Sequence, residues 1–193
     1  MKFKLGDLAD IKIGVVLSRK KDDSIISSSS RHKVVSLKSF NEDGVYESSF
    51  EDEFTPNEKL SNDYFVKKED LLVRLRYPNH AVYIDKECEN LTYTSLIARV
   101  RLKDERFNPK FITHFLNSRA VRKQLHRYIV GTAIPMASVA NLNNIVVPFM
   151  DLDKQLAAVK FLEMARKERD LLKDLAENKD RLTKAIFNEL IGE

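Results

Sequence analysis

The sequence predicts an α+β protein: a mixed α/β globular domain with a twisted, mainly antiparallel sheet, followed by one long C-terminal coiled-coil helix. Short stretches rich in β-branched, leucine and aromatic residues recur through residues 1–150 and indicate strands. Two helical patterns with one apolar side fall within residues 109–129. Residues 151–191 contain no glycine or proline. We therefore divide the chain into a globular domain, residues 1–150, and a long helix, residues 151–193.

The predicted strands are short and are joined by polar loops. Residues 18–33 have neither a helical nor a strand period, so they are expected to form a surface loop. Asp43-Gly44 supplies the positive φ that a tight turn needs, and Pro78 with Asn79 indicates a turn between two strands. The expected strands are residues 2–5, 8–13, 32–37, 64–66, 71–75, 81–84, 91–102 and 143–147.

Two helices are predicted before the last short strand. Asn108-Pro109 is a cap residue followed by proline at the first helical position, and Phe111, Ile112 and Phe115 give that helix its buried side. Ser118 opens the second helix, whose expected inward residues are Val121, Leu125 and Tyr128 or Ile129. The opposite side of this second helix is a basic stripe made of Arg119, Arg122, Lys123 and His126.

The C-terminal helix would extend about 60 Å at roughly 1.5 Å per residue, longer than a small domain is wide. Leucine and isoleucine recur along it at the alternating spacing of three and four that is typical of a coiled-coil seam. Lys179 falls within that seam, where a polar residue usually fixes register. A bent helix that folds back on its own domain is the alternative, but the persistent heptad spacing favours a partner helix. The predicted dimerisation residues are Ala165, Leu172, Leu175, Lys179, Leu182 and Ile186.

Composition excludes several classes of protein. No apolar run approaches the roughly 18 residues of a membrane span, and no signal-peptide core follows Met1. The single cysteine, Cys88, excludes an internal disulfide framework and a cysteine-cluster zinc site, so we expect a cytoplasmic protein. Residues 151–193 hold 9 Lys and Arg against 10 Asp and Glu, which leaves 24 against 19 in residues 1–150. That excess of five positive charges does not by itself indicate nucleic-acid binding.

No pattern of catalytic or metal-binding residues emerges. The four histidines lie far apart, without the spacing of a metal pair. Glycine-rich phosphate loops and the G-x-S-x-G nucleophile motif are absent. The acidic residues 51–53 lack ligand spacing and are more typical of a solvated loop. We therefore predict no catalytic residue, no metal and no cofactor.

Four motifs follow one another in an informative order. They are residues 4–14 (KLGDLADIKIG), residues 70–76 (DLLVRLR), residues 131–135 (GTAIP) with 142–148, and residues 153–159 (DKQLAAV). Together they resemble one target-recognition unit of the specificity subunits of type I restriction–modification systems. Two departures stand out: Lys154 replaces a usually acidic residue, and the chain holds one unit where the family typically carries two. Met1 and Gly192-Glu193 look like natural ends, and both a natural half-length subunit and a fragment of a longer one stay open from the sequence.

The resemblance implies that residues 1–150 are a DNA target-recognition domain whose loops enter the major groove. It also implies that the helix pairs with a second such helix, antiparallel, and is held by the methyltransferase subunits, which bring the restriction subunit. The chain would then be a recognition subunit and not itself an enzyme. A half-length chain restores this arrangement by homodimerising through residues 151–191, and two-fold symmetry would require an interrupted palindrome as the target.

The resemblance also directs the choice of DNA-binding residues. Phosphate contacts need long cations, and base reading needs planar or forked donors and acceptors. Arg76 is expected to read guanine and Asn79 adenine, with Thr132 supporting its loop or binding phosphate. The predicted phosphate contacts are Arg19, Lys20, Lys21, Arg31, Lys33, Arg119, Arg122 and Lys123. The predicted base-edge contacts are Arg74, Arg76, Tyr77 and Asn79, and an inward orientation from its strand is the alternative for Arg74.

Two competing functions remain open from the sequence. The first is a decoy or regulatory protein that binds the modification subunits through the helix and reads no bases. The second is a stand-alone DNA-modifying enzyme, which the missing cofactor and metal motifs disfavour.

Overall fold

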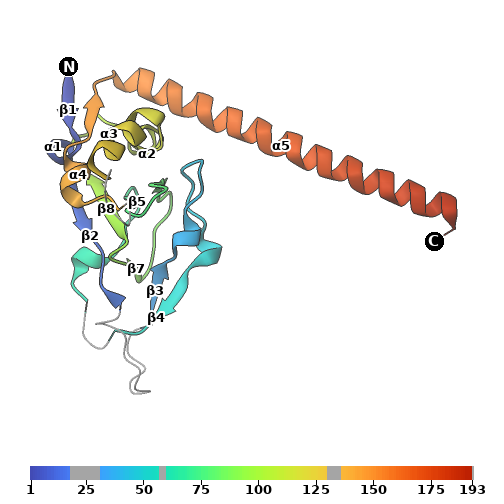
Figure 1. The fold of residues 1–193 in the computed structure, drawn as a ribbon, viewed down its shortest axis with the longest axis horizontal. Helices are drawn as coiled ribbons and strands as arrows, with labels where there is room; N and C mark the ends of the chain where they lie inside the picture. The colour runs from blue at the N-terminus through green and yellow to red at the C-terminus, as the bar shows by residue number, and fades with distance from the viewer. Residues whose placement is uncertain (18–30, 57–59, 130–135, 193) are drawn as a thin grey trace. The chain divides into compact units, whose positions relative to one another are not determined.

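The computed structural model describes residues 1–17, 31–56, 60–129 and 136–192 of the chain. By contacts between residues it divides into two compact units, Met1–Gln155 and Leu156–Glu193. The first unit is a mixed α/β domain, and the second is the greater part of a single helix (Figure 1). This arrangement confirms the predicted α+β class with antiparallel sheets and a long C-terminal helix.

The centre of the first unit is a four-stranded antiparallel sheet in the order β2-β8-β5-β6. The two inner strands are rich in leucine and β-branched residues and are largely buried. Gly14 follows the outer strand β2. Two chain segments approach so closely there that any side chain at this position would clash with the backbone of Tyr93. The strands are β2 (Ala9–Ile13), β8 (Ile97–Leu102), β5 (Leu71–Arg74) and β6 (Ala81–Tyr83).

Two smaller sheets flank this one. In the first, β3 (His32–Val35) pairs antiparallel with β4 (Asp52–Phe54) and parallel with β7 (Leu91–Tyr93). In the second, β1 (Lys2–Lys4) pairs antiparallel with β9 (Val146–Pro148). The parallel pair joins segments far apart in the sequence, which strand patterns alone do not reveal.

Residues of β5 alternate between two apolar cores, as successive strand residues point to opposite faces. Leu71 and Val73 belong to the core beneath the helices, whereas Leu72 belongs to the core shared with β3 and β7. The unit therefore has three layers: helices, the four-stranded sheet and the three-stranded sheet. In Figure 1, α2, α3 and α4 gather at one end of the unit, and β3 and β4 lie toward the other. The helices are α1 (Leu5–Leu8), α2 (Pro109–Leu116), α3 (Arg119–Ile129) and α4 (Val139–Asn143).

The start of α2 is fixed by its cap and by a buried glutamine. The Asn108 side chain accepts a hydrogen bond from the Phe111 amide (3.1 Å), as the Asn-Pro signal predicts. Gln155, fully buried, accepts from the Asn108 amide (2.8 Å) and donates to the carbonyls of Arg106 (2.8 Å) and Met150 (2.6 Å). Two of these three bonds serve the junction before α2, and the third holds the segment before α5.

The long helix, α5, runs over Leu152–Ile191 and confirms the predicted element. Beyond Val159 none of its residues is buried, and its large apolar side chains are exposed. Gly192 follows it with a positive φ, as expected of a helix stop. No helix in the described ranges qualifies as a membrane span.

Several predicted strands have different limits in the structure. Residues 64–66 are not a strand, because Ser61 caps a 3₁₀ helix at Asn62–Tyr64. The single strand expected at residues 91–102 is interrupted by a turn, in which the Ile97 amide donates to the Thr94 carbonyl (2.9 Å). Residue 143 ends α4 instead of beginning a strand, and residues 5–8 form the helical turn α1. In each case local side-chain or backbone hydrogen bonds override the apolar pattern.

The helices bury the expected residues with one exception. Ile112, Val121 and Leu125 are in the core beneath the helices, and Phe111 packs against it. Tyr128, one of the two residues for which the helical period allowed an inward position, is exposed.

A buried ion pair holds β5 against β8. Asp70, fully buried, accepts two hydrogen bonds from the Arg101 guanidinium (2.7 Å each) and one from the Lys67 amide (2.7 Å). These bonds raise the pKa of Arg101 and fix the residue that precedes β5. Because β5 leads into residues 75–80, this pair also sets where that loop begins.

Asp70→Ala should lower the free energy of unfolding by about 3 kcal/mol, since it leaves Arg101 unpaired beside an apolar sheet. Asp63→Ala is the matched control, because Asp63 pairs with Lys12 on the surface (2.7 Å, side chains 61% and 41% exposed) and should cost less than about 1 kcal/mol. Urea denaturation measures both. Equal losses would contradict the structural importance of the buried pair.

Candidate nucleic-acid interface

One face of α3 is basic and carries no acidic residue. The helix contains Val121 and Leu125 on its buried side, while its cationic side chains are exposed. Its start is fixed by Ser118, whose hydroxyl accepts from the Val121 amide (3.4 Å). The exposed face comprises Arg119, Arg122, Lys123, His126 and Arg127. A surface with several cations and no carboxylate on the same helix attracts polyanions.

The loop at residues 75–80 presents two side chains outward. Arg76 and Tyr77 are exposed, Tyr77 to 65%. The loop is held by Asn79, whose side-chain nitrogen donates to the carbonyls of Arg74 (3.1 Å) and Leu75 (2.6 Å). A short loop fixed in this way presents Arg76 and Tyr77 on a defined backbone.

Asn117 brings this loop and α3 together. It lies between α2 and α3, and its carboxamide bonds both backbone groups of Ala81, the first residue of β6. The carboxamide oxygen accepts from the Ala81 amide (2.7 Å), and its nitrogen donates to the Ala81 carbonyl (2.8 Å). The strand residue that follows the loop is thereby tied to the C-cap residue of α2, two residues before α3 begins.

The electrostatics of His80 show the same proximity. Burial lowers the pKa of this imidazole, Glu42 raises it, and the charges of Arg122 and Arg74 lower it again. Arg122, from α3, and Arg74, from β5, therefore act on one buried side chain. Arg74 is half-buried, and its Nε has no hydrogen-bond partner among the described residues.

A third segment borders the loop. Arg76 forms an isolated β-bridge with Met136, and the Ala137 amide donates to the Leu75 carbonyl (2.8 Å). The structure thus brings together Arg74, Arg76, Tyr77, Asn79 and the start of α3 from separate parts of the sequence.

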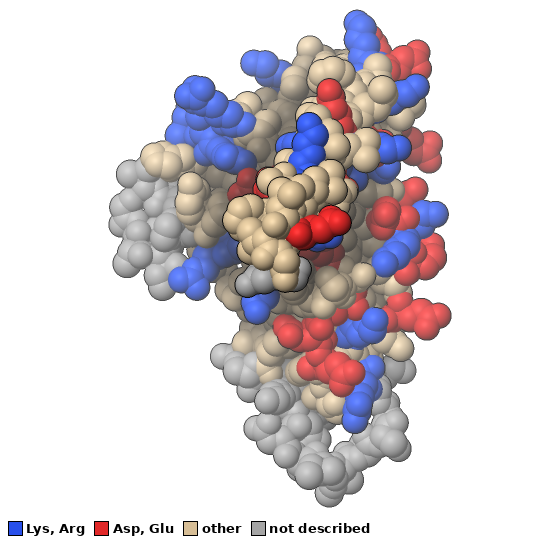
Figure 2. All heavy atoms as spheres, turned by 90° about the vertical axis from the view of Figure 1, so that its right-hand side faces the viewer, with Lys and Arg blue, Asp and Glu red and all other residues tan. Residues whose placement is uncertain are grey.

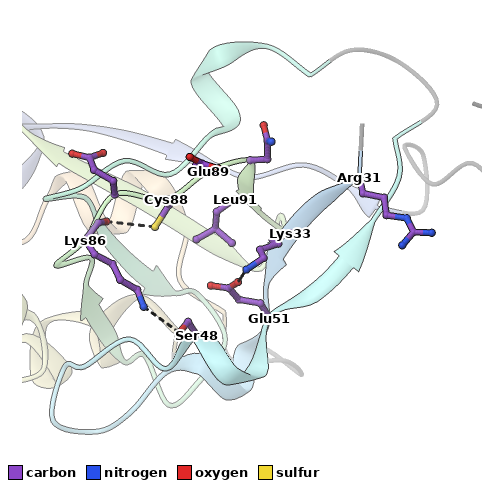
Figure 3. Close-up of a pocket in the computed structure, with 10 residues that line it drawn as sticks. Arg31, Lys33, Ser48, Glu51, Lys86, Cys88, Glu89 and Leu91 are labelled. Carbon is purple, nitrogen blue, oxygen red and sulfur yellow. Dashed lines mark hydrogen bonds and ion pairs between the residues drawn. The ribbon is translucent and has the colours of Figure 1, made fainter. Parts of the chain in front are cut away.

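Arg31, just before β3, and Lys33, on β3, lie elsewhere, and Figure 3 shows Lys33 beside Glu51. Arg31 pairs with Glu53 (3.5 Å), and Lys33 pairs with Glu51 (3.0 Å), which raises the pKa of Lys33. Both line an open depression of about 370 Å³. Their charges are partly compensated, in contrast to those on α3.

Cys88 lies on the same depression, in the loop before β7 (Figure 3). Its thiol contacts the Lys86 carbonyl at 3.6 Å. Burial raises the pKa of Cys88, so the thiol is not activated as a nucleophile.

The remaining predicted contacts are not located by the structure. Arg19, Lys20 and Lys21 fall within residues 18–30, and Thr132 falls within residues 130–135, all outside the described ranges. Within those ranges, no group of three or more His, Cys, Asp and Glu residues could hold a metal ion.

Two contributors were missed from the sequence. Asn117 was overlooked because an asparagine between two helices is usually only a cap. Arg127 was overlooked because it lies beside the stripe, although the absence of acidic residues from 119–129 could have indicated that every cation there matters.

Figure 2 shows one face of the molecule, on which Lys and Arg gather without acidic neighbours on the left and alternate with Asp and Glu on the right.

Comparisons with solved structures show that the fold is shared. The HsdS subunit from Thermoanaerobacter tengcongensis matches with a TM-score of 0.66 and 15% identity, covering 98% of this chain and 48% of that one. The type I restriction–modification S subunit from M. genitalium matches with a TM-score of 0.56 and 19% identity, covering 92% and 41%. A chain from a structure of type I R-M complex assembly and conformational transition matches with a TM-score of 0.64 and 16% identity, covering 95% and 43%.

The chain therefore spans less than half the length of each of these proteins. A search of the curated proteins finds no match. The family described as the type I restriction modification DNA specificity domain matches residues 1–179, nearly the whole chain. The chain belongs to the type I restriction modification DNA specificity domain family.

Proposed function

We propose that this protein is a sequence-specific DNA-binding specificity subunit that directs a type I restriction–modification complex to its target. The observation that carries the proposal is the basic, acid-free face of α3 beside the fixed loop at residues 75–80. Membership of the type I restriction modification DNA specificity domain family supports restriction and modification as the reactions that this DNA binding would direct. In this proposal the chain acts in the cytoplasm and carries out no chemistry. Methyl transfer and DNA cleavage belong to the modification and restriction subunits.

In the proposed complex, α3 and the loop have different tasks. Arg119, Arg122 and Lys123 neutralise phosphates, which positions the domain without reading sequence. Arg76 and Tyr77, exposed on the loop, reach base edges in the major groove, where an arginine pairs best with guanine O6 and N7. Asn79 donates both described hydrogen bonds to its own loop, so its proposed role is to hold Arg76 and Tyr77 in place.

The domain division carries the rest of the proposal. Residues 1–150 are the DNA-recognition domain, and residues 151–193 serve dimerisation and contact with methyltransferase subunits. The apolar side chains exposed along α5 support this assignment, because a lone helix in water does not stabilise such a face. Two copies related by a two-fold axis would read the same half-site on opposite strands, hence an interrupted palindrome.

The same exposed face favours a second function. A decoy or regulatory protein would use α5 to occupy modification subunits and would need no base readers. The two functions differ in DNA selectivity, which the first experiment measures.

Arg76→Ala should cost about 1–3 kcal/mol on the preferred site and flatten the preference at one base pair, because the arginine would lose a bidentate contact. Lys123→Ala is the control, since a phosphate contact should weaken binding to all sequences equally and reduce the salt dependence by about one ion. The measurement is a binding selection from random duplexes, followed by titrations, using the full chain with type I modification subunits.

If the wild-type chain enriches no motif, the decoy function is supported and sequence reading is rejected. If Arg76→Ala weakens preferred and scrambled duplexes equally, Arg76 contacts phosphate only.

Leu172→Glu with Leu182→Glu should convert a dimer to a monomer, because the two exposed leucines (59% and 60%) lie on the proposed interface. Phe187→Glu is the control: Phe187 is equally exposed (60%) but lies outside the 3,4-spaced seam. Light scattering gives the mass, and circular dichroism checks that the globular domain stays folded. An unchanged dimer mass in the double variant would remove this interface from the proposal.

A further inference from the structure

The seam of α5 is longer than the leucine repeat and contains two charges. Phe161, 70% exposed, lies two heptads before Leu175 and therefore extends the seam toward the start of the helix. Glu168 occupies the heptad position of Leu175 and Leu182, and Lys179 occupies that of Leu172. Charges at such positions reduce stability unless an opposite charge meets them.

Neither seam charge has an opposite charge within reach on its own helix. Side chains three and four residues apart are neighbours on a helix. Around Glu168 those positions are Met164, Ala165, Leu171 and Leu172. Around Lys179 they are Leu175, Ala176, Leu182 and Thr183.

Charges outside the seam behave differently. Arg166 approaches Asp170, and Lys173 approaches Glu177, each across one helical turn at 4.0 Å. Ion pairing within the helix is therefore available to charges on the outer face and is denied to Glu168 and Lys179 by their apolar neighbours.

A second copy of α5 can supply the missing partners in only one orientation. A parallel, in-register pair would place Glu168 against Glu168 and Lys179 against Lys179. The seam has two kinds of heptad position, one that includes Leu172 and Lys179 and one that includes Glu168 and Leu175. An antiparallel pair places each position of one kind opposite a position of the other kind, and its possible registers differ by one heptad. Among these registers, one alone sets Glu168 opposite Lys179, and it does so twice because of the two-fold axis.

We propose that two copies of this chain pair antiparallel along α5 in the register in which Glu168 of each copy meets Lys179 of the other. The two-fold axis then passes between Lys173 and Asp174, at the centre of the seam. Shifting the pair by one heptad either way would place both charges against apolar residues of the other copy. The two ion pairs thus act as a register lock.

The same register pairs the apolar seam residues without a gap. Large residues near one end of the seam meet large residues near the other, and the small Ala165 meets a leucine. Apart from the two ion pairs, the facing residues are Phe161 with Ile186, Ala165 with Leu182, and Leu172 with Leu175. All of these large side chains are exposed in the single chain.

This inference rests on the proposed homodimer, and charge reversal tests it separately. Glu168→Lys places like charges together twice in each dimer, so the dissociation constant should rise by on the order of one hundredfold, about tenfold for each contact. Lys179→Glu should weaken the dimer similarly. The double variant Glu168→Lys with Lys179→Glu restores both opposite-charge contacts, so its dissociation constant should return to within about tenfold of wild type. Sedimentation equilibrium of the full chain measures all four.

Rescue by the double variant distinguishes the orientations, because reversing both charges leaves a parallel pair with like charges facing each other. If the single reversals do not weaken the dimer, or the double variant does not recover, the register is wrong. In that case loss of the dimer in Leu172→Glu with Leu182→Glu still supports pairing through the seam. A wild-type chain that is monomeric would overturn both proposals.

Cysteine cross-linking gives an independent readout. In a Cys88→Ser background, Ala165→Cys with Leu182→Cys should form intermolecular disulfides under mild oxidation, because the proposed register places these positions opposite each other. Ala165→Cys alone should not cross-link, since the two copies of residue 165 lie far apart in an antiparallel pair. Cross-linking by Ala165→Cys alone would indicate a parallel pair, in which the two copies of residue 165 face each other, and would reject the proposal.

Discussion

The arrangement of the candidate interface depends on one asparagine. Asn117, at the junction of α2 and α3, bonds both backbone groups of Ala81 in β6. Through it the basic face of α3 lies beside the loop that presents Arg76 and Tyr77. Electrostatic attraction and base reading require different side chains, and in the proposed function this contact places both kinds on the same part of the domain.

The sequence predicted the elements whose cause is local. The Asn-Pro cap of α2, the left-handed Gly44 in its Asp-Gly turn and the uninterrupted α5 each follow from neighbouring residues. What could not be predicted is non-local: the parallel pairing of β3 with β7, and the acidic partners of Arg31 and Lys33 on the adjacent β4 side. From the sequence, Arg31 and Lys33 could not be distinguished from the cations of α3, because the carboxylates that pair with them are brought close only by the fold.

The two units differ in where their apolar side chains lie. The domain buries its apolar strands between helices and a second sheet. The helix unit leaves leucine, isoleucine and phenylalanine in water, so its helical propensity must be supplemented by another surface. In the proposed dimer, the same physical principle, burial of apolar area, would act within the chain in the first unit and between chains in the second.

The loop held by Asn79 has a consequence for how such a protein diversifies. Arg76 and Tyr77 are anchored by backbone contacts of their neighbours and bury little of their own side chains. Exchanging them should cost little folding free energy, since exposed positions away from cores and caps tolerate substitution. In the proposed function, exchanging Arg76 and Tyr77 would therefore change the DNA sequence that the domain recognises while its fold stays the same.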